Sequence, residues 1–274
     1  MADVGVDETL LKRVAEQVAT EAAGLVRKAW DEMAHGRVVG VDTKSADTDV
    51  VTAVDRESEE LVRERLAELR PGEPVLGEEG GGSMASAGGV TWVVDPIDGT
   101  VNFLYGLPWF AVSVAAQVDG VSVAGAVVEP VSGRVWTAAR GQGAWLDGRR
   151  LAVSAPSRLE LTLVGTGFAY SAERRTRQAR FAASVLPRVR DIRRNGAASL
   201  DLCAVGAGWL DAYVEHGLHR WDWAAGALVA SEAGAVVSLP GSAPDLGADA
   251  TYAASPAVAA PLRALLGECG AAEV

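Results

Sequence analysis

The chain has 274 residues, 49% of them hydrophobic, and a formal net charge of −11 at pH 7. This length allows one large core or two fused layers, and the negative charge argues against nucleic-acid binding through a general basic field. Two cysteines do not make the disulfide framework of a secreted scaffold. The acidic N-terminus does not resemble a signal peptide and no apolar run reaches membrane-spanning length, so we expect a cytoplasmic protein without a membrane partner.

The first half of the chain predicts two helices and then antiparallel strands. Apolar residues recur at helical spacing over residues 7–33 and again over residues 52–69. A glycine-rich stretch at residues 80–89 predicts a loop, either a flexible lid or a plain surface connection. Asp119-Gly120 is a dipeptide typical of a hairpin turn. The expected strands are residues 74–79, 90–95, 110–118, 121–129, 133–141 and 143–151.

The second half alternates between strands and helices. Such alternation after an antiparallel meander predicts an α/β (α+β) fold built as a layered sandwich. We expect one domain over residues 1–274, composed of an N-terminal half (1–153) and a C-terminal half (154–274). The expected strands are residues 161–167, 189–194, 210–215 and 235–239, and the expected helices are residues 172–186, 197–207, 222–233 and 256–266.

Asp95 and Asp98 close an apolar strand only three residues apart. A buried carboxylate without a cation costs several kcal/mol, and the nearest basic residues in sequence are Arg70 and Arg134. A hard divalent metal such as Mg²⁺, which prefers oxygen ligands, would resolve this cost. Because a proline stiffens the turn, Asp95, the carbonyl of Ile97 and Asp98 can point to one place.

The next two residues favour phosphate chemistry. Gly99 permits close approach of the backbone, and Thr100 offers a hydroxyl and an N–H at the start of a short helical turn, a typical anion site. Other acids have a structural as well as a functional interpretation. Asp222 can be a first-turn acid of its helix, and Asp55 can complete a capping box with Thr52.

Three motifs carry a family resemblance. The stretch DPIDGTVNF (residues 95–103), preceded by GEEG (77–80) and followed by WDWAAG (221–226), resembles the inositol monophosphatase family in its bacterial type. The match extends over residues 44–234. It implies the layered αβαβα sandwich shared with fructose-1,6-bisphosphatase, a lithium-sensitive phosphatase that uses two to three Mg²⁺ ions, with Mn²⁺ as a substitute, and a homodimer.

The resemblance also implies a role for each residue of the motifs. Metal ions would bind in the N-terminal half, and the attacking water would be oriented there. No phospho-enzyme is implied. By resemblance, the first metal takes Glu78, Asp95 and the Ile97 carbonyl, the second takes Asp95, Asp98 and Asp222, and a third contacts Glu78 through water. The resemblance also implies that Thr100 and Asp55 deprotonate the attacking water and that Asp98, Gly99 and Thr100 hold the phosphate. Lys44 would be the catalytic lysine of the active-site loop.

The C-terminal half would select the substrate. Gly196, Ala198 and Glu215 fall where the family contacts polyol hydroxyls, and Glu215 keeps the family's spacing of seven residues before Asp222. These residues favour inositol 1-phosphate as the substrate. The Arg193-Arg194-Asn195 run departs from the animal type and resembles the bacterial branch, which accepts several sugar and polyol phosphates.

Three alternatives stay open at this point. Histidinol phosphate and nucleotide 3′-phosphates are substrates of relatives in the same superfamily. A partner role of a different class, association with RNA polymerase or with ribosomal RNA factors, could use a basic face formed by residues 174–180 and 188–194. Solvated arginines on a helix are the structural alternative to such a face.

Overall fold

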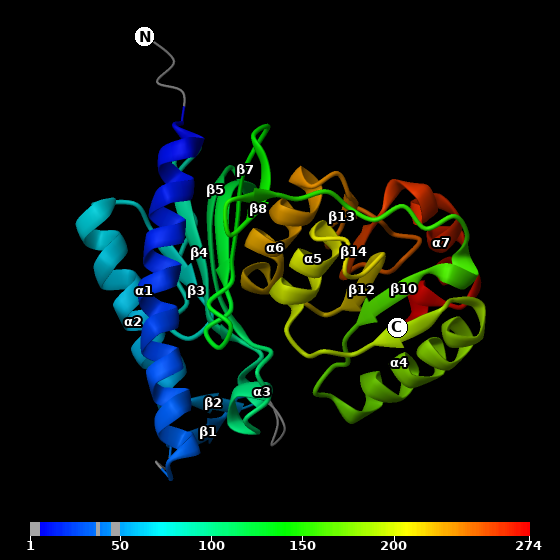
Figure 1. Ribbon diagram of the computed structural model, residues 1–274, viewed down its shortest axis with the longest axis horizontal. Coiled ribbons are helices and arrows are strands. Elements are labelled where there is room, and N and C mark those ends of the chain that lie inside the picture. Colours follow the sequence, from blue (N-terminus) through cyan, green and yellow to red (C-terminus); the bar gives the residue numbers. More distant parts are fainter. Residues whose placement is uncertain (1–5, 37–38, 45–49) are drawn as a thin grey trace.

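A computed structural model describes residues 6–36, 39–44 and 50–274. Across these ranges Figure 1 shows a sandwich of helices, a sheet, helices, a second sheet and an outer layer of helices. The layered αβαβα architecture expected from the sequence is therefore confirmed. In this part of the chain no helix combines the length and the apolar character needed to cross a membrane.

The first outer layer consists of α1 (Glu8–Ala34) and α2 (Ala53–Leu69). The Asp7 carboxylate caps α1 by accepting a hydrogen bond of 2.9 Å from the backbone N–H of Leu10. Small residues, mostly alanine and valine, form the buried face of α1, so this helix packs closely on strands β5 and β6 of the first sheet. A short hairpin of β1 (Val41–Thr43) and β2 (Val50–Thr52) precedes α2.

The first sheet has seven strands in the order β3-β4-β5-β6-β7-β8-β9. The pair β3–β4 is parallel and the remaining pairs are antiparallel. Every residue of β4 is buried because helices cover both faces of this strand. The strands are β3 (Val75–Gly77), β4 (Val90–Asp98), β5 (Ala111–Val118), β6 (Val121–Val128), β7 (Val135–Ala139), β8 (Gly143–Leu146) and β9 (Arg149–Arg150).

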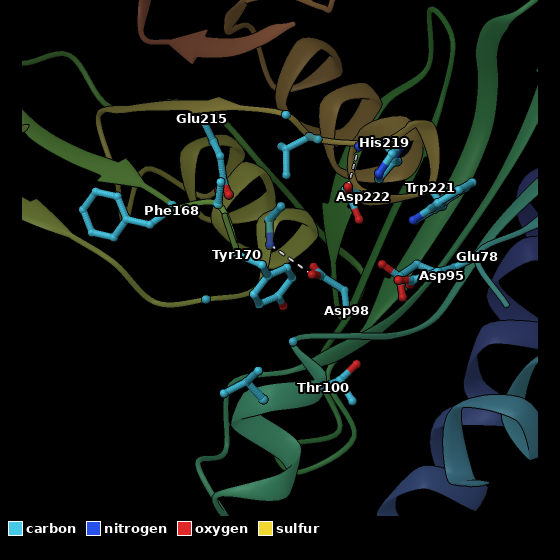
Figure 2. A pocket seen from close by; sticks show the side chains of 18 of the residues that line it. Glu78, Asp95, Asp98, Thr100, Phe168, Tyr170, Glu215, His219, Trp221 and Asp222 are labelled. Atoms are coloured by element: carbon cyan, nitrogen blue, oxygen red, sulfur yellow. Dashed lines mark hydrogen bonds between the residues drawn. The ribbon is translucent and has the colours of Figure 1, made fainter. Parts of the chain in front are cut away.

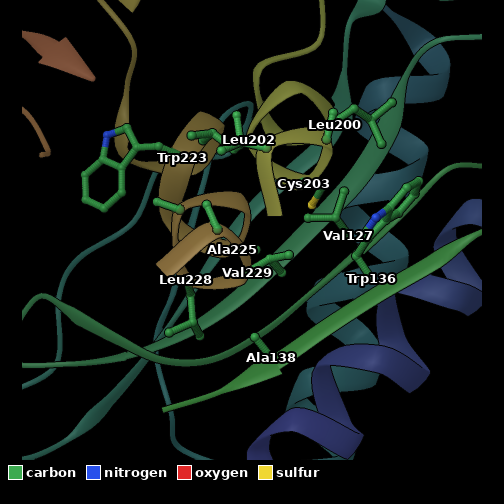
Figure 3. Close-up of a cluster of buried hydrophobic side chains, with 14 of the residues drawn as sticks. Val127, Trp136, Ala138, Leu200, Leu202, Cys203, Trp223, Ala225, Leu228 and Val229 are labelled. Atoms are coloured by element: carbon green, nitrogen blue, oxygen red, sulfur yellow. The ribbon is translucent and has the colours of Figure 1, made fainter. Parts of the chain in front are cut away.

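The middle layer consists of α5 (Ala198–Gly206) and α6 (Arg220–Glu232). All nine residues of α5 are buried, as expected for a helix that lies between two sheets, and two of them, Ser199 and Asp201, are polar. Figure 3 shows Cys203 of α5 and Leu228 of α6 in the core that these helices share with the first sheet. Cys203 is a free, buried thiol that serves as a core residue.

The second sheet has five strands in the order β11-β10-β12-β14-β13, and β10 runs parallel to both of its neighbours. Two helices, α4 (Ala172–Val185) and α7 (Pro256–Glu268), form the last outer layer (Figure 1). The strands are β10 (Leu163–Thr166), β11 (Asp191–Arg193), β12 (Ala212–His216), β13 (Val236–Ser238) and β14 (Ala250–Ala254), and three 3-10 turns lie at Leu159–Leu161, Leu186–Arg188 and Ala271–Glu273.

The structure adds elements that the sequence pattern did not predict. Strand β14 reads ATYAA, which is rich in alanine and has weak strand propensity, yet it pairs with β12 and β13. Helix α6 begins at Arg220, two residues earlier than expected. Strand β4 continues past the expected end to Asp98, with a shift of register against β5 between Asp95 and Asp98. The short helical turn expected at Thr100 is confirmed as α3 (Thr100–Leu104).

Candidate active site

A pocket of about 360 Å³ lies where the first sheet, the middle helices and the second sheet meet. Residues from both halves of the chain line it, from Lys44 and Glu78 to Glu215 and Asp222. Of the twelve site residues named from the sequence, eleven line this pocket. The twelfth, Asp55, is hydrogen bonded to one of them, Thr100. These lining residues are Lys44, Glu78, Asp95, Ile97, Asp98, Gly99, Thr100, Gly196, Ala198, Glu215 and Asp222.

Four acids lie at one end of this pocket (Figure 2). The parallel pairing of β3 and β4 continues into a hydrogen bond of 3.2 Å from the Glu78 N–H to the Val94 carbonyl, so Glu78 lies beside Asp95. Figure 2 shows Asp98 and Asp222 turned toward the same space as Glu78 and Asp95. We call these four residues, Glu78, Asp95, Asp98 and Asp222, the acid cluster.

Burial and mutual repulsion make the acid cluster costly to ionise. Burial, followed by the charges of Glu78, Asp98 and Asp222, raises the pKa of Asp95 well above its ordinary value of 3.8. Burial and the neighbouring carboxylates raise the pKa of Asp222 in the same way. Burial raises the pKa of Asp98 to about 7, although hydrogen bonds from Ser199 and Ala198 oppose the shift. An added cation would favour the ionised form of all of these groups.

The acid cluster suits a divalent cation in the type of its donor atoms and in its negative charge. The acid cluster and the Ile97 carbonyl offer only oxygen atoms, which are the ligands that Mg²⁺ prefers. In the described part of the chain, no three Asp, Glu, His or Cys side chains are already gathered as a coordination site. Instead the carboxylates have partners in the protein: Asp222 accepts a hydrogen bond of 2.6 Å from the His219 N–H, and Glu78 pairs with Lys44 at 2.8 Å.

Asp98 connects the two halves of the chain. Its Oδ1 accepts from the backbone N–H of Ala198 at 3.2 Å, and its Oδ2 accepts from the N–H and the hydroxyl of Ser199. Ala198 and Ser199 are the first residues of α5, and no side chain of α5 itself caps this helix. Asp98 therefore serves as the cap of a helix that belongs to the other half.

Thr100 and Asp55 form the pair expected from the sequence. The Thr100 hydroxyl lies 2.9 Å from Asp55 Oδ1 and 3.0 Å from the Ile97 carbonyl oxygen. The other oxygen of Asp55 accepts the N–H of Thr52 at 2.8 Å, which confirms the capping box as well. Burial raises the pKa of Asp55, and nearby Glu78 adds to that shift while the threonine hydrogen bonds oppose it. Asp55 thus serves the helix with one oxygen and faces Thr100 with the other.

Gly99 stands where the chain turns from β4 into α3 with φ of +94°. A side chain is excluded here on two counts, because positive φ strains other residues and because a Cβ would lie 3.2 Å from the carbonyl oxygens of both Gly196 and Trp109. The close approach of Gly99 and Gly196 joins the acid end of the pocket to the loop that precedes α5.

The opposite end of the pocket is built around Glu215 on β12. The Tyr213 hydroxyl donates to Glu215 Oε2, and a Cβ on Gly167 would lie 2.0 Å from the Glu215 carboxylate. Gly167 therefore leaves the space in which this carboxylate lies. Burial raises the pKa of Glu215, whereas the Tyr213 hydrogen bond and the positive charge of Arg194 oppose that shift. Gly196 and Ala198 also line the pocket.

Sequence reasoning assigned no role to several residues of this site. Glu79 shares Lys44 with Glu78, Ser199 holds Asp98, and Tyr213 holds Glu215. The doubled acid in GEEG was the one local signal for Glu79. Ser199 contacts Asp98 from an element far away in the sequence, so no local pattern indicates it. Tyr213 lies two residues before Glu215 on β12, where alternate residues share one face, and this spacing was the local signal for it.

Comparison with known proteins agrees with this architecture. The model of the inositol monophosphatase family matches residues 7–270. An inositol-1-monophosphatase from Mycobacterium leprae is 54% identical over 275 residues, covering 95% of this chain and 94% of the relative. The Nus factor SuhB of Pseudomonas aeruginosa is 41% identical over 230 residues, with 82% and 83% covered.

A solved structure shows the same fold. Mycobacterium tuberculosis SuhB superposes with a TM-score of 0.83 at 45% sequence identity, and the alignment covers 97% of this chain and 99% of that one. The family match covers the acid cluster, the Thr100–Asp55 pair and Glu215 in a single stretch. This chain belongs to the inositol monophosphatase family.

Proposed function

We propose that this protein is a Mg²⁺-dependent phosphomonoesterase that hydrolyses a small polyol or sugar phosphate, with inositol 1-phosphate as the first choice. The observation that carries the proposal is the acid cluster: two buried carboxylates, Asp95 and Asp98, and two partly buried ones, Glu78 and Asp222, line one pocket beside the Thr100–Asp55 pair. The name of the 54% identical relative, an inositol-1-monophosphatase, supports the substrate. Mn²⁺ is proposed as a substitute metal, and two to three ions as the full complement.

The proposed mechanism follows from the side chains. Glu78, Asp95, Asp98, Asp222 and the Ile97 carbonyl would hold the cations, which would neutralise the phosphate and make a water more acidic. Thr100 would accept a proton from the attacking water and give its own hydroxyl proton to Asp55, whose Oδ1 already accepts from the Thr100 hydroxyl at 2.9 Å. Lys44, in contact with Glu78, adds positive charge at the mouth of the acid cluster. The amides at Gly99 and Thr100, with Asp98, would hold the phosphate.

Substrate selection is proposed for the Glu215 end. Glu215 would accept hydrogen bonds from polyol hydroxyls, with Gly196 and Ala198 leaving space for the ring. A neutral ring rich in hydroxyls suits a carboxylate that Tyr213 already fixes through one oxygen. Histidinol phosphate and nucleotide 3′-phosphates remain the alternative substrates of the same chemistry.

The test is a phosphate-release assay with Mg²⁺ over inositol, histidinol, fructose, glycerol and nucleotide phosphates. We expect the highest kcat/KM for inositol 1-phosphate and no release of phosphate in EDTA. Phosphate release that continues undiminished in EDTA would contradict the metal-dependent mechanism. A preference for histidinol phosphate or a nucleotide would move the assignment to that substrate and leave the mechanism standing.

A second candidate function is association with the transcription machinery, because one relative is named Nus factor SuhB. Four of the eight arginines that would form its basic face pair with acids of this chain. Arg174 pairs with Asp249 at 2.7 Å, and Arg188 pairs with Glu268 at 2.8 Å. Arg177 and Arg193 are also paired. We therefore rank this function below phosphate hydrolysis.

The remaining proposals concern organisation. We propose a cytoplasmic homodimer with one domain per chain, residues 1–274. Its N-terminal half, 1–153, would carry the metal site, and its C-terminal half, 154–274, the substrate-selecting residues. The pocket supports the single domain, because Asp98 from one half caps α5 of the other.

A further inference from the structure

Glu59 is a buried carboxylate that lies outside the pocket. It stands on α2 with 2% of its surface exposed. Its Oε2 accepts the backbone N–H of Glu79 at 2.7 Å, and its Oε1 accepts the N–H of Gly80 at 2.8 Å. Both oxygens are thus committed to the two peptide groups that follow Glu78.

Arg63, one turn further along α2, completes this arrangement. Its Nε donates to Glu59 Oε1 at 2.8 Å, so the buried carboxylate has a cationic partner. Its Nη1 donates to the Val75 carbonyl at 3.3 Å and its Nη2 to the Gly81 carbonyl at 2.6 Å. The two side chains together hold the turn 75–81 at its start, its middle and its end.

The glycines of this turn show how closely it is packed on Glu59. A Cβ on Gly77 would lie 2.4 Å from the carboxyl carbon of Glu59, and a Cβ on Gly80 would lie 2.6 Å from its Oε1. Neither glycine has the positive φ that alone would explain it. Glycine is therefore required at residues 77 and 80 because a Cβ at either position would collide with the Glu59 carboxylate.

Between these anchors lies a single acid of the pocket. The Glu78 N–H is held by Val94 of β4, and the next two peptide groups are held by Glu59. The main chain of Glu78 is consequently fixed from both sides. A carboxylate whose main chain is fixed reaches a cation without ordering a loop at the moment of binding, which strengthens binding.

We propose that Glu59, supported by Arg63, is a positioning residue for divalent-cation binding, which acts by fixing the turn that presents Glu78. The inference rests on the proposed function, in which Glu78 is a metal ligand. It concerns the affinity for the cation more than the rate once the cation is bound.

The test measures binding of Mn²⁺ to the full chain by electron paramagnetic resonance without substrate, and kcat at saturating Mg²⁺. Three variants disturb the turn in different ways. Glu59→Gln removes the charge and one acceptor, and Glu59→Asp keeps the charge but shortens the reach. Gly80→Ala displaces the carboxylate and changes no charge. Glu60→Gln, an exposed neighbour on α2, and Gly24→Ala, which meets no atom within 4 Å, are the matched controls.

We expect all three variants to bind Mn²⁺ at least about tenfold more weakly, the size of effect typical for residues that hold metal ligands in place. Their kcat at saturating Mg²⁺ should stay within about threefold of the wild-type value, and both controls should bind Mn²⁺ normally. The melting temperature in EDTA is recorded for each variant, so that lost folding is distinguished from lost affinity.

Two results would overturn the inference. The first is wild-type Mn²⁺ affinity in folded Glu59→Asp and Gly80→Ala, even with a lowered melting temperature. It would show that the position of the turn does not control Mn²⁺ affinity and that Glu59 contributes only its charge or general stability. Equal loss in Glu60→Gln would likewise point to the electric field alone. Failure of the wild-type protein to bind Mn²⁺ at all is a separate result, because it contradicts the proposed function itself.

Discussion

The two ends of the pocket treat a buried carboxylate in different ways. At the acid cluster, burial, followed by the charges of neighbouring carboxylates, raises the pKa of Asp95 and of Asp222. At the other end, Glu215 is also buried, but Tyr213 donates to it and Arg194 attracts it. Within the described ranges, the carboxylates at the first end outnumber their one cationic partner, Lys44, whereas at the second end a hydroxyl donor and an arginine partly offset the burial of a single carboxylate. Under the proposed function, this difference would separate the residues that act on the phosphate from those that select the leaving group.

The largest effect is expected for Asp95→Asn, which removes a carboxylate whose ionisation the other three acids of the cluster oppose. Loss of an anionic ligand should lower kcat at least about 100-fold, about 2.7 kcal/mol in transition-state terms. The same change removes a buried repulsion, so the metal-free variant should melt at a higher temperature than the wild type. Phosphate release and melting in EDTA measure the two effects, with exposed Asp31→Asn as the control. Full activity of Asp95→Asn would refute a metal role for this residue.

The next effect tests the Glu215 end. Glu215→Gln weakens a hydrogen bond from a hydroxyl to a charged acceptor, worth about 1.5–3 kcal/mol. We expect kcat/KM for inositol 1-phosphate to fall by about ten- to a hundredfold. Hydrolysis of p-nitrophenyl phosphate, which has no such hydroxyls, should change little. An equal loss on both substrates, or none on either, would remove Glu215 from substrate selection while leaving the acid cluster unaffected.

Asp201 tests whether a neutral donor alone can balance a buried acid. This α5 carboxylate accepts 2.7 Å from the Asn195 amide, yet burial raises its pKa from 3.8 to about 8. Since the folded state keeps its proton up to a higher pH than the unfolded state, the stability from Asp201 is present below about pH 4 and is lost as pH rises to about 8. The slope is on the order of 1 kcal/mol per pH unit.

The matching variant is Asp201→Asn, measured by denaturant unfolding in EDTA at pH 5 and pH 8. The wild type should be less stable at pH 8, and the variant should lose less stability over the same interval. An identical loss in both proteins would mean that Asn195 already offsets the burial of Asp201.

The smallest expected effect is that of Tyr213→Phe. The phenol holds one oxygen of Glu215, and a hydrogen bond of ordinary strength contributes about 0.5–1.5 kcal/mol. We expect kcat/KM for inositol 1-phosphate to fall by about two- to tenfold, with p-nitrophenyl phosphate unaffected. Combined with Glu215→Gln, the Tyr213 change should add almost nothing, because both act through one contact. Fully additive losses would show that Tyr213 acts elsewhere.

Local patterns predicted what is local in this fold. The strand before Asp95, the turn at Gly99 and the hairpin at Asp119-Gly120 depend on neighbouring residues, and the structure contains all three. Strand β14 was not predicted, because its alanines become a strand only through pairing with β12 and β13. The same holds for Glu59, which in sequence is one acid among several on an amphipathic helix and whose contacts lie about twenty residues away.

The family's spacing predicted that Asp98 and Glu215 would share a pocket, which no propensity or periodicity could have done. What that spacing could not predict is how the protein holds its own acids. The contact of Ser199 with Asp98 depends on how α5 packs against the end of β4, and the two residues lie 101 positions apart in the sequence.

The hydrogen bonds of Asp98 limit how many further groups its carboxylate can bind. A carboxylate has about four lone-pair directions, and Ala198 and Ser199 use three of them: one on Oδ1 and both on Oδ2. A single direction, on Oδ1, is left for anything that enters the pocket. Asp98 can therefore join a cation through one oxygen only, while its other oxygen keeps the two halves of the chain fastened together.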